Sequence, residues 1–343
     1  MNRKGLHLML GSSDDLPAIR TILSEVAPDL GVNWVILEVD YHFAYQSQPE
    51  LGEPGSIDHT QARELAGVAN ENGISLVPQF QCLSHQSFRE EIFPLLREYP
   101  ELDEKPDLDL AAFRFDNFHS WCPCQPQLYP IVFGLIDELI EAFRPPAVHI
   151  GLDEVFVLGE CPRCRGAKPG DLFADTILAL HGHVTGSHRL ETQMWGDRLI
   201  PQSLGYNMWE CSHNGTDAAL DRIPRDIVIT DWHYEVMPDG EYPSVAWFQR
   251  MGFRVWPGGC YYPAAVEGLI DASRRTDDGR MLGYLATTWQ PVADLCPHLM
   301  DERVEAVAES MDATKDFWSI TNASEKLIRT AACVRLGMRL ARD

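Results

Sequence analysis

The fold and the site are decided by one stretch, Val148-His149-Ile150-Gly151-Leu152-Asp153-Glu154-Val155. Its first half is apolar and follows an amphipathic run that ends at Arg144-Pro145-Pro146. This pattern predicts a short buried strand that leads into two adjacent carboxylates, Asp153 and Glu154. Neighbouring acids at the end of an apolar strand are costly unless they are paired or used in chemistry. We therefore place a functional site at the end of this strand.

Seven further apolar segments alternate with longer amphipathic stretches. They span residues 6–10, 34–39, 74–80, 190–195, 227–232, 253–256 and 281–288. Near-continuous apolar strands that alternate with helices predict an all-parallel sheet of the α/β class. We expect a single (β/α)8 TIM barrel over about 5–300, with a C-terminal helical extension over about 301–343. An open doubly wound sheet is the alternative, but no glycine-rich phosphate-binding motif follows the first strand.

The composition narrows the class of partner. The chain has 343 residues, with 28 basic against 51 acidic side chains and a net charge of −23. This balance argues against nucleic acid and against anionic membrane surfaces, which favour basic patches. The N-terminal apolar run is too short for a signal peptide, so we expect a cytoplasmic protein whose nine cysteines are free thiols. The oligomeric state is left open.

In such a barrel the chemistry lies at the C-terminal ends of the strands. Four of the nine tryptophans fall at the ends of four successive strands, with carboxylates between them. Core packing explains any single one of them more simply, but a ring of indoles and polar groups suits a sugar. The residues that we expect to bind substrate are Asp40, His85, His149, Trp195, Asp197, Trp232, Tyr234, Trp256 and Trp289.

The adjacency of Asp153 and Glu154 constrains the mechanism. Glycosidases with two independent carboxylates hold them roughly 5–10 Å apart, on opposite sides of the bond that breaks. Adjacent residues cannot easily flank a bond in this way. One acid can be held protonated as a general acid while the other stays ionised. The pattern therefore favours a mechanism in which the substrate supplies the nucleophile.

Residues 149–155 resemble the His-x-Gly-Gly-Asp-Glu signature of glycoside hydrolase family 20, the β-N-acetylhexosaminidases. The similarity extends to residues 76–85, to Cys122-Pro123, to Trp195-Gly196-Asp197 and to Trp289. It spans roughly residues 30–295 in the family's order.

The resemblance implies that Glu154 protonates the glycosidic oxygen and that Asp153 orients the 2-acetamido group. It also implies an acetamido pocket walled by Trp195, Trp232 and Trp289, with a tyrosine on the carbonyl. Tyr234, Tyr261 and Tyr262 are all candidates for that tyrosine. His85 and His149 are expected to support the pocket.

Several positions depart from the family pattern. No arginine follows the first strand, and Leu152 stands where the family has its second glycine. The strand-three acids become Gln79 and Gln81, and Gln290-Pro291 follows Trp289. The expected activity is an exo-β-N-acetylhexosaminidase-like glycosidase that acts through the 2-acetamido group. The alternatives are a related glycosidase for another sugar and a sugar-binding barrel without catalysis.

The cysteines allow one further interpretation. Cys161 and Cys164 have zinc-knuckle spacing, and Cys122 and Cys124 could supply two more thiolates. No catalytic cofactor is expected. A structural zinc ion is the weaker alternative to plain loop cysteines, because a Cys-x-Cys pair is a less specific signal than a second Cys-x-x-Cys.

Overall fold

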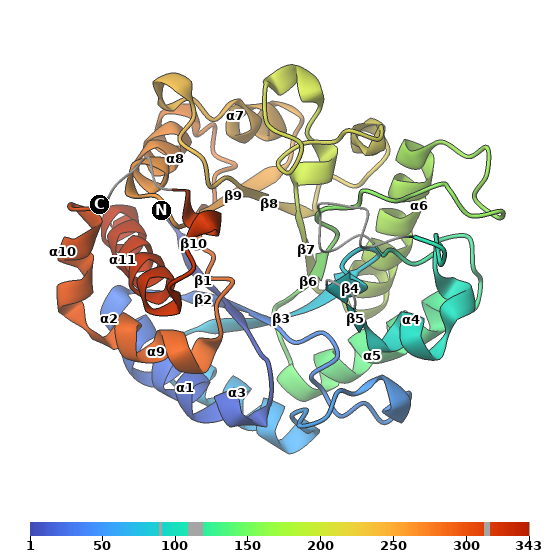
Figure 1. The fold of residues 1–343 in the computed structure, drawn as a ribbon, viewed down its shortest axis with the longest axis horizontal. Helices are drawn as coiled ribbons and strands as arrows, with labels where there is room; N and C mark the ends of the chain where they lie inside the picture. The colour runs from blue at the N-terminus through green and yellow to red at the C-terminus, as the bar shows by residue number, and fades with distance from the viewer. Residues whose placement is uncertain (89–90, 109–118, 312–315, 343) are drawn as a thin grey trace.

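The computed structural model describes residues 1–88, 91–108, 119–311 and 316–342. Eight parallel strands close into a barrel in the order β1-β10-β9-β8-β7-β6-β3-β2, which confirms the predicted (β/α)8 architecture (Figure 1). The strands are β1 Arg3–Met9, β2 Trp34–Glu38, β3 Ser75–Cys82, β6 Ala147–Gly151, β7 Glu191–Trp195, β8 Val228–Trp232, β9 Arg254–Gly259 and β10 Gly283–Ala286. A separate two-stranded sheet pairs β4 Ser87–Phe88 with β5 Glu91–Ile92.

Helices form the outer layer around the strands (Figure 1). They are α1 Leu16–Thr21, α2 Ala27–Leu30, α3 His59–Glu71, α4 Pro94–Glu98, α5 Leu128–Phe143, α6 Pro169–His181, α7 Pro243–Arg250, α8 Pro263–Thr276, α9 Val292–Met300, α10 Glu305–Ala308 and α11 Ala323–Arg342. α11 packs against β1, β10, α8 and α9, so the C-terminal helical segment completes the outer layer. Within the described ranges, every helix is too short or too polar to cross a membrane.

Local sequence explains the element boundaries. The Asp58 side chain accepts a hydrogen bond from the backbone of Gln61, whose own side chain bonds back to Asp58, so a capping box starts α3. α5 ends at Arg144, which has a left-handed φ of 48° and precedes two prolines that cannot continue a helix. All five residues of β6 are buried, as expected for a strand covered on both faces.

Trp256 is not at the site, which corrects the sequence-based prediction. We expected its strand to end there, but β9 continues through Pro257 to Gly259. The fully buried Trp256 ring packs edge-on against Trp34 at 5.9 Å, near the amino ends of the strands. A Cβ on Gly5 would lie 2.2 Å from this ring, so glycine on β1 makes room for the indole. Trp256 therefore fills the barrel interior near the amino ends of the strands.

Candidate active site

The two acids follow β6 in a sharply turned segment. The strand ends at Gly151, two residues before Asp153. Gly151, Leu152 and Glu154 have left-handed φ values of 64°, 75° and 50°. Such values are unusual for side chains other than glycine, and they cluster at functional sites. The turn supplies the bend that brings both carboxylates to the same side.

Asp153 and Glu154 converge on one histidine. Nε2 of His85 lies 3.3 Å from Oδ2 of Asp153 and 3.3 Å from Oε2 of Glu154. The His85 side chain is 23% exposed, whereas the side chains of Asp153 and Glu154 are 8% and 15% exposed. The two acidic side chains therefore share one cationic partner, and they do not face each other across a gap.

Burial opposes ionisation of both His85 and Asp153, but their mutual attraction outweighs it. Desolvation alone would lower the pKa of His85, yet the carboxylates of Asp153 and Glu154 raise it well above its usual value. Desolvation would likewise raise the pKa of Asp153, but the charge on His85 and a hydrogen bond from Gln81 lower it below 3.8. Asp153 is therefore ionised and His85 is protonated at neutral pH.

Gln81 and Ser84 hold Asp153, and sequence reasoning missed both roles. Nε2 of Gln81 donates to Oδ1 of Asp153 at 2.7 Å, and the Ser84 hydroxyl donates to the Asp153 carbonyl. The register between β3 and β6 shifts between Gln79 and Cys82, and such a bulge re-aims a side chain. A Cβ on Gly151 would lie 2.0 Å from Oε1 of Gln81, so glycine leaves the space that Gln81 crosses. The alternation Gln79-x-Gln81 along β3 was the available signal.

Asp197 positions the dyad from the next strand. Its Oδ2 accepts hydrogen bonds from the backbone N–H of Glu154 at 2.9 Å and from Nε of Arg198 at 2.6 Å. Its Oδ1 accepts from Nε1 of Trp232 at 3.3 Å. Burial raises the pKa of Asp197 to about 6, although Arg198 opposes the shift. Both oxygens accept hydrogen bonds from the protein and the residue is buried, so Asp197 positions Glu154 and Trp232. Its contact with substrate stays a prediction.

Aromatic side chains from β8 and β10 form one wall beside the dyad. The rings of Trp232 and Tyr234 stack with centroids 5.1 Å apart. The Tyr234 hydroxyl accepts a hydrogen bond from Nε1 of Trp289 at 2.5 Å and lies 2.9 Å from Oγ1 of Thr287. Trp289 is half-buried, so part of its ring is accessible to a ligand. The structure thus brings together Trp232, Tyr234 and Trp289, three of the predicted sugar-binding residues.

Trp195 lies between the aromatic wall and His149. Trp195 is fully buried, with its ring 4.6 Å from His149 and 5.8 Å from Trp289. Nδ1 of His149 accepts from the backbone N–H of Gly151, so Nε2 donates to Oγ1 of Thr230 at 2.9 Å. Burial lowers the pKa of His149 to about 3 and keeps it neutral. His149 therefore supports Trp195 and the strand end, as the resemblance implied, and its contact with substrate stays a prediction.

The first two strands contribute a polar pair, His7 and Glu38, and no arginine directly follows β1. Nε2 of His7 lies 3.3 Å from Oε2 of Glu38, which also accepts from Nε2 of Gln79 at 2.6 Å. Burial and the negative charge of Asp153 raise the pKa of Glu38 to about 7. Oδ1 of Asp40 accepts from the backbone N–H of Gln81 at 2.7 Å, which ties the loop after β2 to β3. Sequence reasoning singled out Asp40 but missed His7 and Glu38, the polar residues within otherwise apolar strands.

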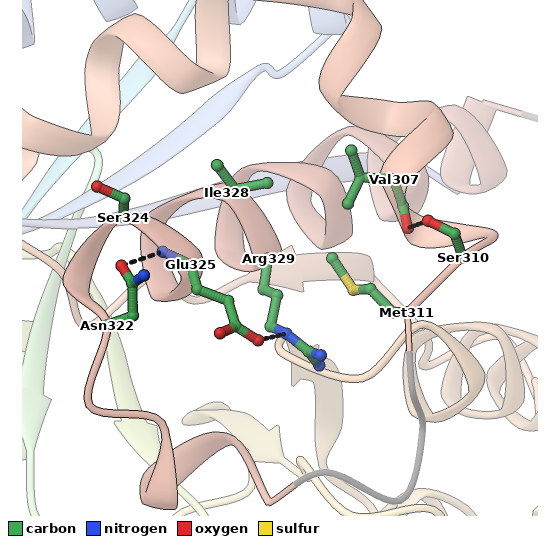
Figure 2. A pocket seen from close by; sticks show the side chains of 8 residues that line it. All are labelled: Val307, Ser310, Met311, Asn322, Ser324, Glu325, Ile328 and Arg329. Carbon is green, nitrogen blue, oxygen red and sulfur yellow. Dashed lines mark hydrogen bonds and ion pairs between the residues drawn. The ribbon is translucent and has the colours of Figure 1, made fainter.

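A groove in the outer helical layer is not part of this site. It lies between α10 and α11 and is lined by residues that include Val307, Met311, Ile328 and Arg329 (Figure 2). Arg329 donates to Glu325 at 3.1 Å within α11. None of the side chains drawn in Figure 2 comes from a barrel strand or from the loops that carry the dyad. The chemistry of the strand ends therefore defines the candidate site.

Comparison with known proteins identifies the relatives of this chain. No established family model matches it. The chain is 23% identical over 182 residues to the beta-hexosaminidase of Vibrio furnissii, a match that covers 52% of this chain and 27% of that protein. A beta-hexosaminidase of Akkermansia muciniphila is 24% identical over 116 residues, which cover 33% of this chain and 23% of that protein.

Solved structures extend the likeness to the whole barrel. The chitobiase of Flavobacterium johnsoniae superposes with a TM-score of 0.63 at 17% identity, covering 97% of this chain and 51% of that one. The family 20 exo-β-N-acetylglucosaminidase of Vibrio harveyi superposes with a TM-score of 0.62 at 14% identity, covering 99% of this chain and 58% of that one. The chain is thus similar in sequence to two beta-hexosaminidases over part of its length, and similar in fold to family 20 glycoside hydrolases. It spans about half the length of these solved structures, and the (β/α)8 barrel is the part that they share with it.

The opposite charges of His85 and Asp153 predict a pH dependence of stability. A raised His85 pKa stabilises the fold fully below the unfolded value of 6.5, and this contribution is lost as the pH rises through the folded pKa. A lowered Asp153 pKa stabilises it fully above 3.8, and this contribution is lost as the pH falls through the folded pKa. The loss of unfolding free energy caused by His85→Gln should therefore be greatest between pH 3.8 and 6.5.

Urea unfolding of the wild type and of His85→Gln at a series of pH values measures this difference in unfolding free energy. Above pH 6.5 the difference in unfolding free energy should shrink by at most about 1.4 kcal/mol per pH unit. His298→Gln on the outer helix α9 is the control and should show no such window. A His85→Gln difference that does not vary with pH would contradict the charged pair.

Proposed function

We propose that this barrel hydrolyses terminal β-linked N-acetylhexosamine residues with retention of configuration, through participation of the substrate's 2-acetamido group. The observation that carries the proposal is the convergence of Asp153 and Glu154 on His85, at 3.3 Å from each. A second carboxylate across the bond is what an enzyme nucleophile or base requires. Adjacent acids leave one proton donor and one charge stabiliser, so the nucleophile comes from the substrate.

The roles follow from the environment of each side chain. Glu154 is the more exposed acid of the two and protonates the leaving oxygen. Asp153 is held ionised and stabilises positive charge on the acetamido group in the oxazolinium-like intermediate. Trp289, Tyr234 and Trp232 offer aromatic faces to the sugar ring and its acetamido methyl. The names of the beta-hexosaminidase relatives, and the N-acetylglucosamine bound in the Vibrio harveyi enzyme, agree with this assignment.

Hydrolysis of a panel of nitrophenyl β-glycosides tests the proposal. We expect turnover of the N-acetylglucosaminide or N-acetylgalactosaminide, release of the β-anomer in early NMR spectra, and no turnover of the 2-hydroxy analogue. A thiazoline that mimics the cyclised acetamido group should inhibit. Release of the α-anomer, or equal turnover of the 2-hydroxy sugar, would refute substrate assistance. Thiazoline binding without any turnover would point instead to a non-catalytic sugar-binding barrel.

A related glycosidase with a different sugar is the second candidate, and the end of β1 favours it. His7 and Glu38 lie there in place of an arginine that would grip sugar hydroxyls. Near neutral pH, Glu38 can donate or accept a hydrogen bond, because its pKa is about 7. Turnover of another sugar on the panel, with no thiazoline inhibition, would support this candidate. The cytoplasmic location stays a prediction.

A further inference from the structure

A buried group of thiols joins the two segments that border the dyad. Sγ of Cys122 lies 3.2 Å from Sγ of Cys161 and 3.4 Å from Sγ of Cys164. All three cysteines are free and buried. One carboxylate oxygen of Glu104 and the three sulfurs lie within 4.8 Å of one another. Cys122 precedes α5, whereas Cys161 and Cys164 belong to the loop between β6 and α6.

The backbone orients these groups toward a common point. The N–H of Cys164 donates to Sγ of Cys161 at 3.3 Å, so the Cys-x-x-Cys turn holds its two sulfurs together. Oε1 of Glu104 accepts from the N–H groups of Glu160 at 2.6 Å and Cys161 at 3.1 Å. Among the described residues, the buried Oε2 of Glu104 has no hydrogen-bond partner. A buried carboxylate oxygen left in this state is costly unless a cation satisfies it.

We propose that Cys122, Cys161, Cys164 and Glu104 bind one Zn²⁺ ion. Thiolates and carboxylates are both zinc ligands, and four protein ligands make a closed, structural site. With Zn–S bonds of about 2.3 Å, tetrahedral thiolates lie about 3.8 Å apart. The sulfurs are slightly closer than this, so a small outward movement accommodates the ion. The site is separate from the glycosidase proposal and does not depend on it.

The position of this zinc site gives it a role in holding the dyad. Cys161 follows Glu154 in the same loop. On the other side, the backbone N–H of Trp121, next to Cys122, donates to the carbonyl of Leu83, two residues before His85. A zinc ion here would therefore clamp the segment that carries His85 to the loop that carries both acids. Exposed Cys124 is not within the compact group and is the alternative fourth ligand.

Metal analysis of the full chain tests the site. Protein from zinc-supplemented medium, treated briefly with EDTA, should retain about one zinc per chain. Cys161→Ser and Cys164→Ser should each reduce the content to less than about a tenth of that value. Cys296→Ser, which changes a buried cysteine in α9, is the matched control and should retain the metal. His188→Ala should also retain it, although His188 belongs to another group of potential ligands with Asp137 and His183.

Alkylation of the unaltered protein keeps the test valid if a variant fails to fold. A strong chelator should speed alkylation of Cys122, Cys161 and Cys164, located by peptide mass spectrometry, and leave Cys296 unchanged. Absence of metal from the folded chain, or a disulfide between Cys122 and Cys161, would overturn the site. Loss of zinc in Cys124→Ser but not in Glu104→Gln would overturn Glu104 as the fourth ligand.

Discussion

Replacing Glu154 with glutamine is expected to lower kcat/KM on a disaccharide of N-acetylhexosamine by about 10²–10⁴-fold. Glutamine has nearly the same shape and can keep the backbone contact from Glu154 to Asp197, but it carries no transferable proton. A sugar alkoxide is a poor leaving group, so the transition state needs that proton. Steady-state kinetics on the disaccharide measure the loss, and KM should change little.

The leaving group separates a lost acid from a damaged fold. A nitrophenolate leaves without protonation, so Glu154→Gln should lose far less activity on the nitrophenyl glycoside than on the disaccharide. Glu267→Gln, an exposed change on α8, is the matched control and should behave as wild type on both substrates. Equal losses on the two substrates would show that Glu154 is not the proton donor.

The barrel could be predicted from the sequence because its strands are buried on both faces. The run Val35–Leu37 in β2 is fully buried, and all five residues of β6 are buried. The ends of strands were harder to place, because backbone dihedrals are set by tertiary contacts. Leu152 and Glu154 take left-handed conformations that their side chains do not favour, and β9 runs through a proline and two glycines that read as a loop.

The site was predictable in part, for a related reason. The acids and the aromatic wall follow strands in the sequence, and their resemblance to one family fixes their order. Their partners come from distant segments: Gln81 reaches Asp153 across 72 positions, and Asp197 reaches the backbone of Glu154 across 43. Only three-dimensional packing shows that Gln81, which departs from the family pattern, holds the dyad. The same packing places Trp256 inside the barrel against Trp34, away from the dyad.

Asp153→Asn should lower kcat by about 10²–10³-fold on both the disaccharide and the nitrophenyl substrate. Asparagine preserves the size of the side chain, but it removes the negative charge that the lowered pKa of Asp153 maintains. In the proposed mechanism this charge faces the acetamido group as it becomes positive, whichever group leaves. The loss should therefore be insensitive to the leaving group, in contrast to the loss in Glu154→Gln.

Ligand binding tests the role of Asp153 without turnover. Asp153→Asn should weaken binding of the thiazoline, which mimics the cyclised acetamido group, far more than binding of N-acetylglucosamine. Asp294→Asn, an exposed change on α9, provides the control for both ligands. If Asp153→Asn weakens both ligands equally, Asp153 only shapes the pocket through Gln81 and His85. Asparagine has the same shape as aspartate. A selective loss of thiazoline binding would therefore show that the negative charge of Asp153 acts on the reacting acetamido group.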